Sequence, residues 1–240
     1  MKVLVLRPKD QAGELASLIE QRGHEAIVIP AIEIVPPSDW GPIDDALGRA
    51  DGFDWIVFTS SNGVHSILER MKETGIGKSR TPNNIGAIGP GTRAALEKHG
   101  LGVAWMPSRY TTTAISEELP DPPAKVLLVR ADIATPLLET RLRDRGFEVE
   151  RIDAYRTNSV NAARIVQAVK EGVDAIAFTS ASIVRSFLEA VEDRRFLKGI
   201  LIASIGPAST EALREAGIEP SVEADPHSAA GLADVLAQEP

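Results

Sequence analysis

The sequence predicts an α/β protein with parallel sheets, and three observations support this prediction. Short, almost continuously apolar segments alternate with segments whose apolar residues recur at helical spacing, as in a parallel sheet covered by helices on both faces. The order of these segments occurs twice. Two extended segments, residues 31–37 and 153–157, occupy equivalent places in the two repeats. We therefore expect an internal duplication that gives two flavodoxin-like, or Rossmann-like, lobes joined by two extended linkers.

Five short motifs recur in the same order in the two halves of the chain. The number of residues between the two copies of a motif changes only across loops, as expected when helices and strands are retained and loops vary in length. The motifs are Leu6-Arg7 with Val129-Arg130, Arg22-Gly23 with Arg145-Gly146, Phe58-Thr59-Ser60 with Phe178-Thr179-Ser180, Ile88-Gly89-Pro90 with Ile205-Gly206-Pro207, and Thr111 with Ser228. Chance explains one such match, but five in order indicate a duplication.

The elements of the first half follow from its apolar patterning. Strands are expected at residues 2–7, 26–35, 54–60, 85–89 and 103–106, the long second one being closed by Pro36-Pro37. Helices are expected between them: one with Leu15 and Ile19 on its apolar face, one with Val64 and Ile67, and two shorter ones at 91–99 and 113–119. The second half repeats this order.

Composition and charge narrow the class of protein. The 240 residues are 43% hydrophobic and 25% charged, which suits a globular protein with two cores of roughly 100–120 residues each. The absence of cysteine excludes disulfides, thiolate nucleophiles and cysteine-held metals. A net charge of −8 makes nucleic acids and anionic membranes poor partners. Because no signal peptide or membrane-length apolar run is recognisable, we expect a cytoplasmic protein.

Polar residues follow the predicted strands, at the sheet edge where doubly wound folds bind ligands. Each is an ordinary helix N-cap when taken alone, but the set is repeated in both halves and favours a ligand with several carboxylates or phosphates. These candidate substrate-binding residues are Thr59, Ser60, Ser61, Asn62, Thr92, Thr111, Thr179, Ser180 and Ser209.

Two arginines and a tyrosine complete the candidate site. Arg7 and Arg130 end the first strand of each repeat, and each either binds a substrate carboxylate or forms an ion pair within the protein. Tyr155 lies in the second extended segment, and its simplest interpretation is an aromatic residue whose ring packs against a lobe. The sequence has no phosphate-binding loop, dinucleotide fingerprint, nucleophile elbow or pair of histidines at metal-ligand spacing, so we assign no metal site.

A set of longer motifs then extends over nearly the whole chain. They are Val5-Leu6-Arg7-Pro8, residues 22–37, residues 58–64, residues 85–92, Ala154-Tyr155-Arg156-Thr157, Phe178-Thr179-Ser180 and residues 202–210. Their order, with the two linker segments, resembles the uroporphyrinogen-III synthase family. The resemblance implies two α/β lobes that exchange the first strand–helix segment of each repeat. Residues 1–35 with 158–240 are expected to form one lobe and residues 38–152 the other, with linkers at 31–37 and 153–157.

The resemblance also implies a function. It predicts a lyase that uses no cofactor or metal and cyclises hydroxymethylbilane, with loss of water and inversion of ring D, to uroporphyrinogen III. Tyr155 matches a tyrosine implicated in departure of the leaving group, whereas Thr92, Ser60 and Ser180 match loop positions. Ser209 stands where relatives often carry threonine. A monomer is expected, with transient contact to hydroxymethylbilane synthase.

Two other functions compete with this interpretation. A cytoplasmic two-lobed module that binds or senses a small anion would need the same polar loops but no chemistry. A nucleotide- or flavin-dependent oxidoreductase is disfavoured because the glycine fingerprint is missing.

Overall fold

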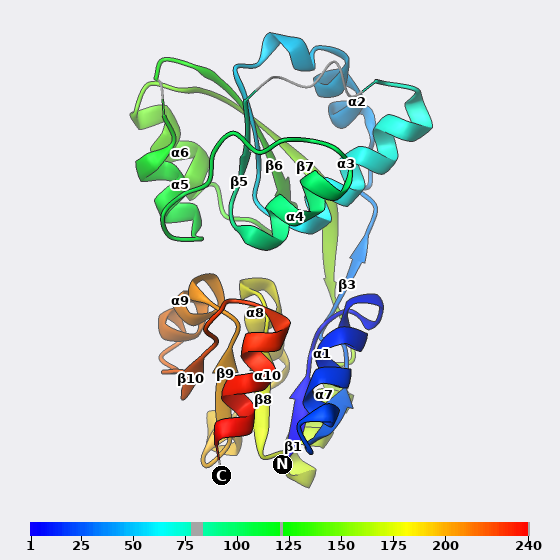
Figure 1. Cartoon of the computed structure of the whole chain (residues 1–240), viewed down its shortest axis with the longest axis vertical. Coiled ribbons are helices and arrows are strands. Elements are labelled where there is room, and N and C mark those ends of the chain that lie inside the picture. Colours follow the sequence, from blue (N-terminus) through cyan, green and yellow to red (C-terminus); the bar gives the residue numbers. More distant parts are fainter. Residues whose placement is uncertain (78–83, 121, 240) are drawn as a thin grey trace. The chain divides into compact units, whose positions relative to one another are not determined.

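The computed structural model describes residues 1–77, 84–120 and 122–239, which form two compact units. The terminal unit comprises Met1–Glu33 and Asn158–Pro240, and the central unit comprises Ile34–Thr157. Each unit contains one five-stranded sheet with helices on both of its faces (Figure 1). The predicted α/β fold with parallel sheets is therefore confirmed.

The sheet of the terminal unit has the strand order β10-β9-β8-β1-β2, and its neighbouring strands run parallel. This is the 2-1-3-4-5 order of flavodoxin-like folds. Its elements are β1 (Lys2–Val5), α1 (Lys9–Gln21), β2 (Glu25–Val28), α7 (Ala162–Glu171), β8 (Ala175–Phe178), α8 (Ala181–Ala190), η3 (Arg194–Leu197), β9 (Leu201–Ser204), α9 (Pro207–Glu215), β10 (Val222–Glu223) and α10 (Ala229–Gln238).

The sheet of the central unit has the strand order β3-β7-β6-β4-β5, and parallel pairing joins β7, β6, β4 and β5. Its elements are β3 (Ile32–Val35), α2 (Gly41–Gly48), η1 (Ala50–Gly52), β4 (Trp55–Phe58), α3 (Ser61–Thr74), β5 (Asn84–Ala87), α4 (Pro90–Lys98), α5 (Thr112–Glu118), β6 (Lys125–Ala131), α6 (Leu137–Asp144) and β7 (Glu148–Ser159). The division between the units runs through β3 and through the end of β7.

The first strand–helix segment of each repeat pairs with strands of the other repeat. In the terminal unit, Leu4 of β1 pairs with Ile27 of β2 on one side and with Ile176 of β8 on the other. In the central unit, β6 from the second repeat pairs with β4 from the first, with Leu128 opposite Val57. Each sheet is thus completed by strands that are distant in sequence.

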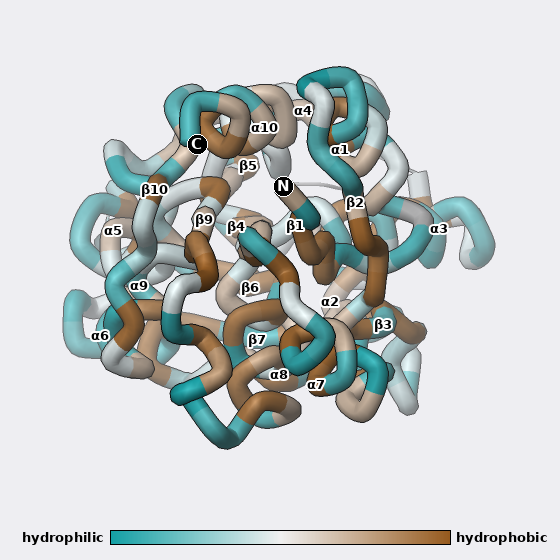
Figure 2. The backbone as a smooth tube through the Cα atoms, turned by 90° about the horizontal axis from the view of Figure 1, so that it is seen from below, coloured by the Kyte–Doolittle hydropathy of each residue, from teal (hydrophilic) through white to brown (hydrophobic). Residues whose placement is uncertain are grey.

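Alternation along the strands directs apolar side chains to two cores in the central unit. One core packs Phe58, Ile152 and Ala154 against α2, α3 and α4, and the other packs Val57 and Leu128 against α5 and α6. In the terminal unit, Val3 and Val5 pack against α1 and α10. The tube in Figure 2 is correspondingly hydrophobic along β1 and β9.

Two predicted strands differ from the structure. The expected strand at 26–35 is two strands, β2 and β3, which belong to different sheets. Pro30 lies between them, and its missing N–H prevents a continuous hydrogen-bonded strand. The expected strand at 103–106 is a single bridge from Trp105 to Gly86.

Within the described parts of the chain, no helix combines the length and the apolar composition needed to cross a lipid bilayer.

Candidate active site

Two serines begin equivalent helices with the same geometry. Ser60 has backbone angles of φ −165° and ψ 156° and caps α3, and Ser180 has φ −165° and ψ 158° and caps α8. The Ser60 hydroxyl accepts the N–H of Gly63 at 3.0 Å, and the Ser180 hydroxyl accepts that of Ile183 at 3.2 Å. Both serines therefore satisfy an N-terminal backbone donor, as ordinary caps do.

The remaining hydroxyl candidates have differing exposure. Thr111 caps α5 by accepting the N–H of Ala114 at 3.1 Å and is half-buried. The hydroxyl of half-buried Thr59 donates to the Val129 carbonyl at 3.0 Å. Thr92 is 5% exposed. Ser209 is 1% exposed and donates to the Gly206 carbonyl at 2.9 Å, so its hydroxyl is committed within its own turn.

Tyr155 owes its orientation to an irregularity in β7. Arg130 pairs with Asp153 and Ala131 with Tyr155, so the register shifts by one residue at Ala154. Ala154 and Tyr155 consequently both lie in the core beside α3, although successive residues of a regular strand point to opposite faces. The Ser66 hydroxyl donates to the Ala154 carbonyl at this shift.

The phenol of Tyr155 lies at the start of α3. Its hydroxyl is 2.9 Å from the Ser60 hydroxyl, and the residue as a whole is 7% exposed. Burial raises the pKa of the Tyr155 phenol above its ordinary value of 10.0, although hydrogen bonds from Ser60 and Asn62 lower it in part. The nearby charge of Asp132 adds to the rise and that of Arg130 opposes it. At neutral pH the Tyr155 phenol therefore keeps its proton and is able to donate a hydrogen bond.

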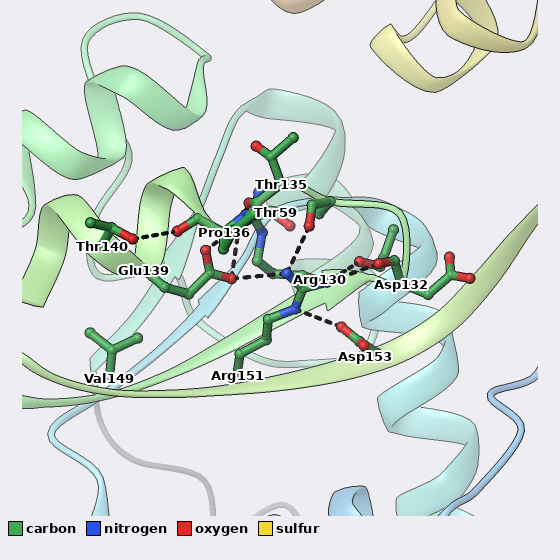
Figure 3. Close-up of polar contacts among 12 residues, drawn as sticks. Thr59, Arg130, Asp132, Thr135, Pro136, Glu139, Thr140, Val149, Arg151 and Asp153 are labelled. Atoms are coloured by element: carbon green, nitrogen blue, oxygen red, sulfur yellow. Dashed lines mark hydrogen bonds and ion pairs between the residues drawn. The ribbon is translucent and has the colours of Figure 1, made fainter.

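Arg130 forms the ion pair that was one of its two open interpretations. Its Nη1 donates to both oxygens of Glu139, at 2.9 and 2.7 Å, and to the Thr135 carbonyl at 2.8 Å (Figure 3). The two side chains are only 5% and 3% exposed. Arg151 lies against the same carboxylate at 3.3 Å and bonds Asp153 at 2.6 Å. The expectation that Arg130 contacts substrate is therefore corrected, because its guanidinium is buried and paired inside the central unit.

The other candidates lie at the carboxyl ends of their strands. Arg7 and Thr179 are half-buried after β1 and β8 of the terminal unit. Ser61 and Asn62 are half-buried at the start of α3 in the central unit. Their placement leaves these side chains partly accessible at the sheet edge of their own unit.

Two residues with ring side chains, Tyr110 and His227, were not predicted from the sequence. A Cβ on Gly89 would lie 3.2 Å from the Tyr110 side chain, and a Cβ on Gly206 would lie 3.0 Å from that of His227. Tyr110 and His227 immediately precede the duplicated caps Thr111 and Ser228, so aligning the repeats would have revealed their equivalence. His227 also lies 3.2 Å from Glu223, which accepts a hydrogen bond from Thr210. His227 is thus an exposed residue that belongs to a polar cluster with Glu223 and Thr210.

Two further features lie outside this arrangement. A shallow groove runs along α7 and contains none of the candidate residues; Val166, Lys170 and Ala190 are among its lining. Among the described residues, no group of three or more acidic or histidine side chains is arranged to hold a metal ion.

Comparison with known proteins assigns the chain to a family. Residues 13–234 match the family model described as uroporphyrinogen-III synthase HemD. The chain is 26% identical to the uroporphyrinogen-III synthase of Synechococcus elongatus, over 96% of this chain and 92% of that protein, and 28% identical to that of Chlorobaculum parvum, over 90% of each. In fold, it matches the crystal structure of a mutant uroporphyrinogen III synthase from the bacterium Thermus thermophilus with a TM-score of 0.79 at 22% identity, over 99% and 98% of the two chains. This protein belongs to the uroporphyrinogen-III synthase family.

Proposed function

We propose that this protein cyclises hydroxymethylbilane to uroporphyrinogen III, with loss of one water and inversion of ring D. Family membership over nearly the whole chain supports the reaction. The observation that carries it in the structure is the buried Tyr155 hydroxyl, which lies 2.9 Å from the Ser60 hydroxyl at the carboxyl edge of the central sheet. Ligands of doubly wound folds bind at this edge.

In the proposed reaction, Tyr155 assists the departure of the hydroxyl group of ring A. The pyrrole nitrogen of the substrate supplies the electron pair that breaks the carbon–oxygen bond, and Tyr155 transfers its phenolic proton to the leaving oxygen, which departs as water. Ring D then attacks through its substituted carbon, and the spiro intermediate fragments and recombines with ring D inverted. The proton that ring D loses when ring closure restores its aromaticity returns to the Tyr155 phenolate. Because the substrate supplies both reacting carbons, positioning supplies much of the catalysis, up to roughly 7–11 kcal/mol.

The carboxylates of the substrate require donors, and helix starts provide them. We retain as proposed substrate contacts Thr59, Ser61, Asn62, Thr92 and Thr111 of the central unit, and Arg7, Thr179 and Ser180 of the terminal unit. We exclude Arg130, whose buried guanidinium is paired with Glu139, and Ser209, whose buried hydroxyl is bonded to the Gly206 carbonyl.

The proposed reaction uses no cofactor, because it is a dehydration and rearrangement without net oxidation. We also propose that the protein is a cytoplasmic monomer, which rests on its acidic, cysteine-free composition alone. Activity that survives dialysis against a chelator would support a reaction without a metal cofactor, and light scattering tests the monomeric state.

The decisive experiment couples hydroxymethylbilane synthase to this protein and separates the oxidised porphyrin isomers. The bilane closes spontaneously to isomer I, so isomer III is expected only when this protein is present. The Tyr155→Phe variant is expected to make isomer III roughly tenfold or more slowly, since it lacks the donor. Isomer I alone from folded wild-type protein would refute the proposed function, and unchanged kinetics of Tyr155→Phe would refute the role of the phenol.

A further inference from the structure

The two units share the same arrangement of hydrogen bonds around the start of one helix. In the central unit, Ser60 caps α3 and the Ser66 hydroxyl donates to the Ala154 carbonyl. In the terminal unit, Ser180 caps α8 and the Ser186 hydroxyl donates to the Ala31 carbonyl at 2.7 Å. This arrangement of cap and strand is therefore duplicated, and differences within it mark what one unit alone has acquired.

Two positions of this arrangement differ. Tyr155 follows Ala154, whereas Ile32 follows Ala31 at the equivalent place. Gly63 is the third residue of α3, whereas Ile183 is the third residue of α8. The central unit, which carries the phenol, thus also carries a glycine beside it.

Gly63 lies in close packing between Val129, Ser60 and the phenol ring. A Cβ at Gly63 would lie 3.0 Å from Val129, 3.4 Å from the Ser60 hydroxyl and 3.9 Å from Cε1 of Tyr155. A Cβ here would therefore press first on Val129, and it would fill the remaining space beside the Ser60 hydroxyl and the Tyr155 ring, which lie at ordinary contact distance. Gly63 is buried and has an ordinary negative φ, so close packing is the reason for glycine here.

The Ser60 hydroxyl is fixed from two sides. It accepts the Gly63 N–H at 3.0 Å, which sets its position, and it lies 2.9 Å from the Tyr155 hydroxyl. Ser180 has the same cap and the same backbone angles, but an isoleucine occupies the place of the tyrosine. Ser180 shows that capping requires only the bond to the backbone N–H. The additional contact of Ser60 with the Tyr155 hydroxyl therefore serves a second purpose.

We infer that Ser60 is a positioning residue, which holds the Tyr155 hydroxyl in place for the proposed reaction rather than binding substrate itself. This inference rests on the proposed function. It replaces the expectation that Ser60 is a substrate contact, because the Ser60 hydroxyl is already shared between the Gly63 N–H and the Tyr155 hydroxyl.

The test compares Ser60→Gly with Ser180→Gly, because glycine at an N-cap costs little stability and both variants lose the same cap hydroxyl. The readout is the titration of Tyr155, followed by phenolate absorbance and isolated from that of Tyr110 by subtracting the Tyr155→Phe spectrum. Since the Ser60 bond lowers the pKa of Tyr155, Ser60→Gly is expected to shift this titration to higher pH. Ser180→Gly is expected to leave it unchanged.

Kinetics supply the second readout. Ser60→Gly is expected to lower kcat roughly 3- to 10-fold, the effect of one lost hydrogen bond, with little change in KM, and Ser60→Thr is expected to restore most of it. A rise in KM with unchanged kcat would make Ser60 a substrate contact, and a Tyr155 titration unaffected by Ser60→Gly would overturn the inference. If wild-type protein makes only isomer I, the proposed function fails, while the titrations still decide whether Ser60 holds Tyr155.

Discussion

The sequence predicted which types of residue occur at the candidate site but not which contacts each of them makes. The sequence identified Ser60, Arg130 and Tyr155 as polar or aromatic residues near strand ends. It left open whether Arg130 meets a ligand, because its partner Glu139 is nine residues later and is identified only when α6 packs on the sheet. The position of Tyr155 depends on a register shift that has no sequence signature.

The raised pKa of Tyr155 leads to a pH prediction. The folded protein holds the phenol proton more tightly than the unfolded chain, whose tyrosines titrate near 10.0. The stability that this provides is complete below pH 10.0 and is lost as the pH rises through the higher pKa of the folded state. Wild-type protein minus Tyr155→Phe is thus expected to show a phenolate transition above pH 10.0. A transition at or below that pH would contradict the burial of the phenol.

Glu139 is predicted to be among the most sensitive carboxylates of the central unit. Glu139→Ala leaves the Arg130 guanidinium buried without its partner, which is expected to cost about 3–5 kcal/mol of unfolding free energy. Glu97→Ala is the matched control in the same unit, because the Arg93–Glu97 pair is 49% and 47% exposed and contributes at most about 1 kcal/mol. Urea unfolding of the two variants measures the difference. Equal costs would mean that the Arg130–Glu139 pair tolerates loss of one partner.

At the scale of elements, the apolar pattern predicted which segments form structure better than where they end. The helix with Val64 and Ile67 on its apolar face is α3, and both residues are buried in it. The pattern joined β2 to β3 because apolar residues continue across Pro30, while the missing N–H separates the two strands. Residues 103–106 have the apolar pattern of a strand, but only Trp105 forms a bridge to β5. The Trp105 ring also packs edge-on against Trp55, with 6.4 Å between the ring centroids.

At the scale of the whole molecule, the exchange of segments makes one unit continuous in sequence and the other discontinuous. The central unit is one continuous segment, Ile34–Thr157. The terminal unit needs residues 1–33 as well as 158–240, because β1 is hydrogen-bonded between β8 and β2, and Leu15 and Ile19 of α1 belong to its core. The duplication alone does not predict that one unit is continuous and the other discontinuous, because it would equally allow two continuous lobes.

This difference predicts how fragments behave. The fragment 34–157 is expected to unfold cooperatively on heating, since it contains β4 to β7 and both of their cores. The fragment 158–240 is expected to show no cooperative transition, because it lacks β1 and the apolar face of α1. A permuted fragment that joins residue 240 to residue 1 through a glycine–serine linker supplies both, and Figure 1 shows the two termini at the same end of this unit. Circular dichroism with thermal melting distinguishes the three. If 158–240 alone melts cooperatively, or the permuted fragment does not, the exchanged segment is not what completes the terminal sheet.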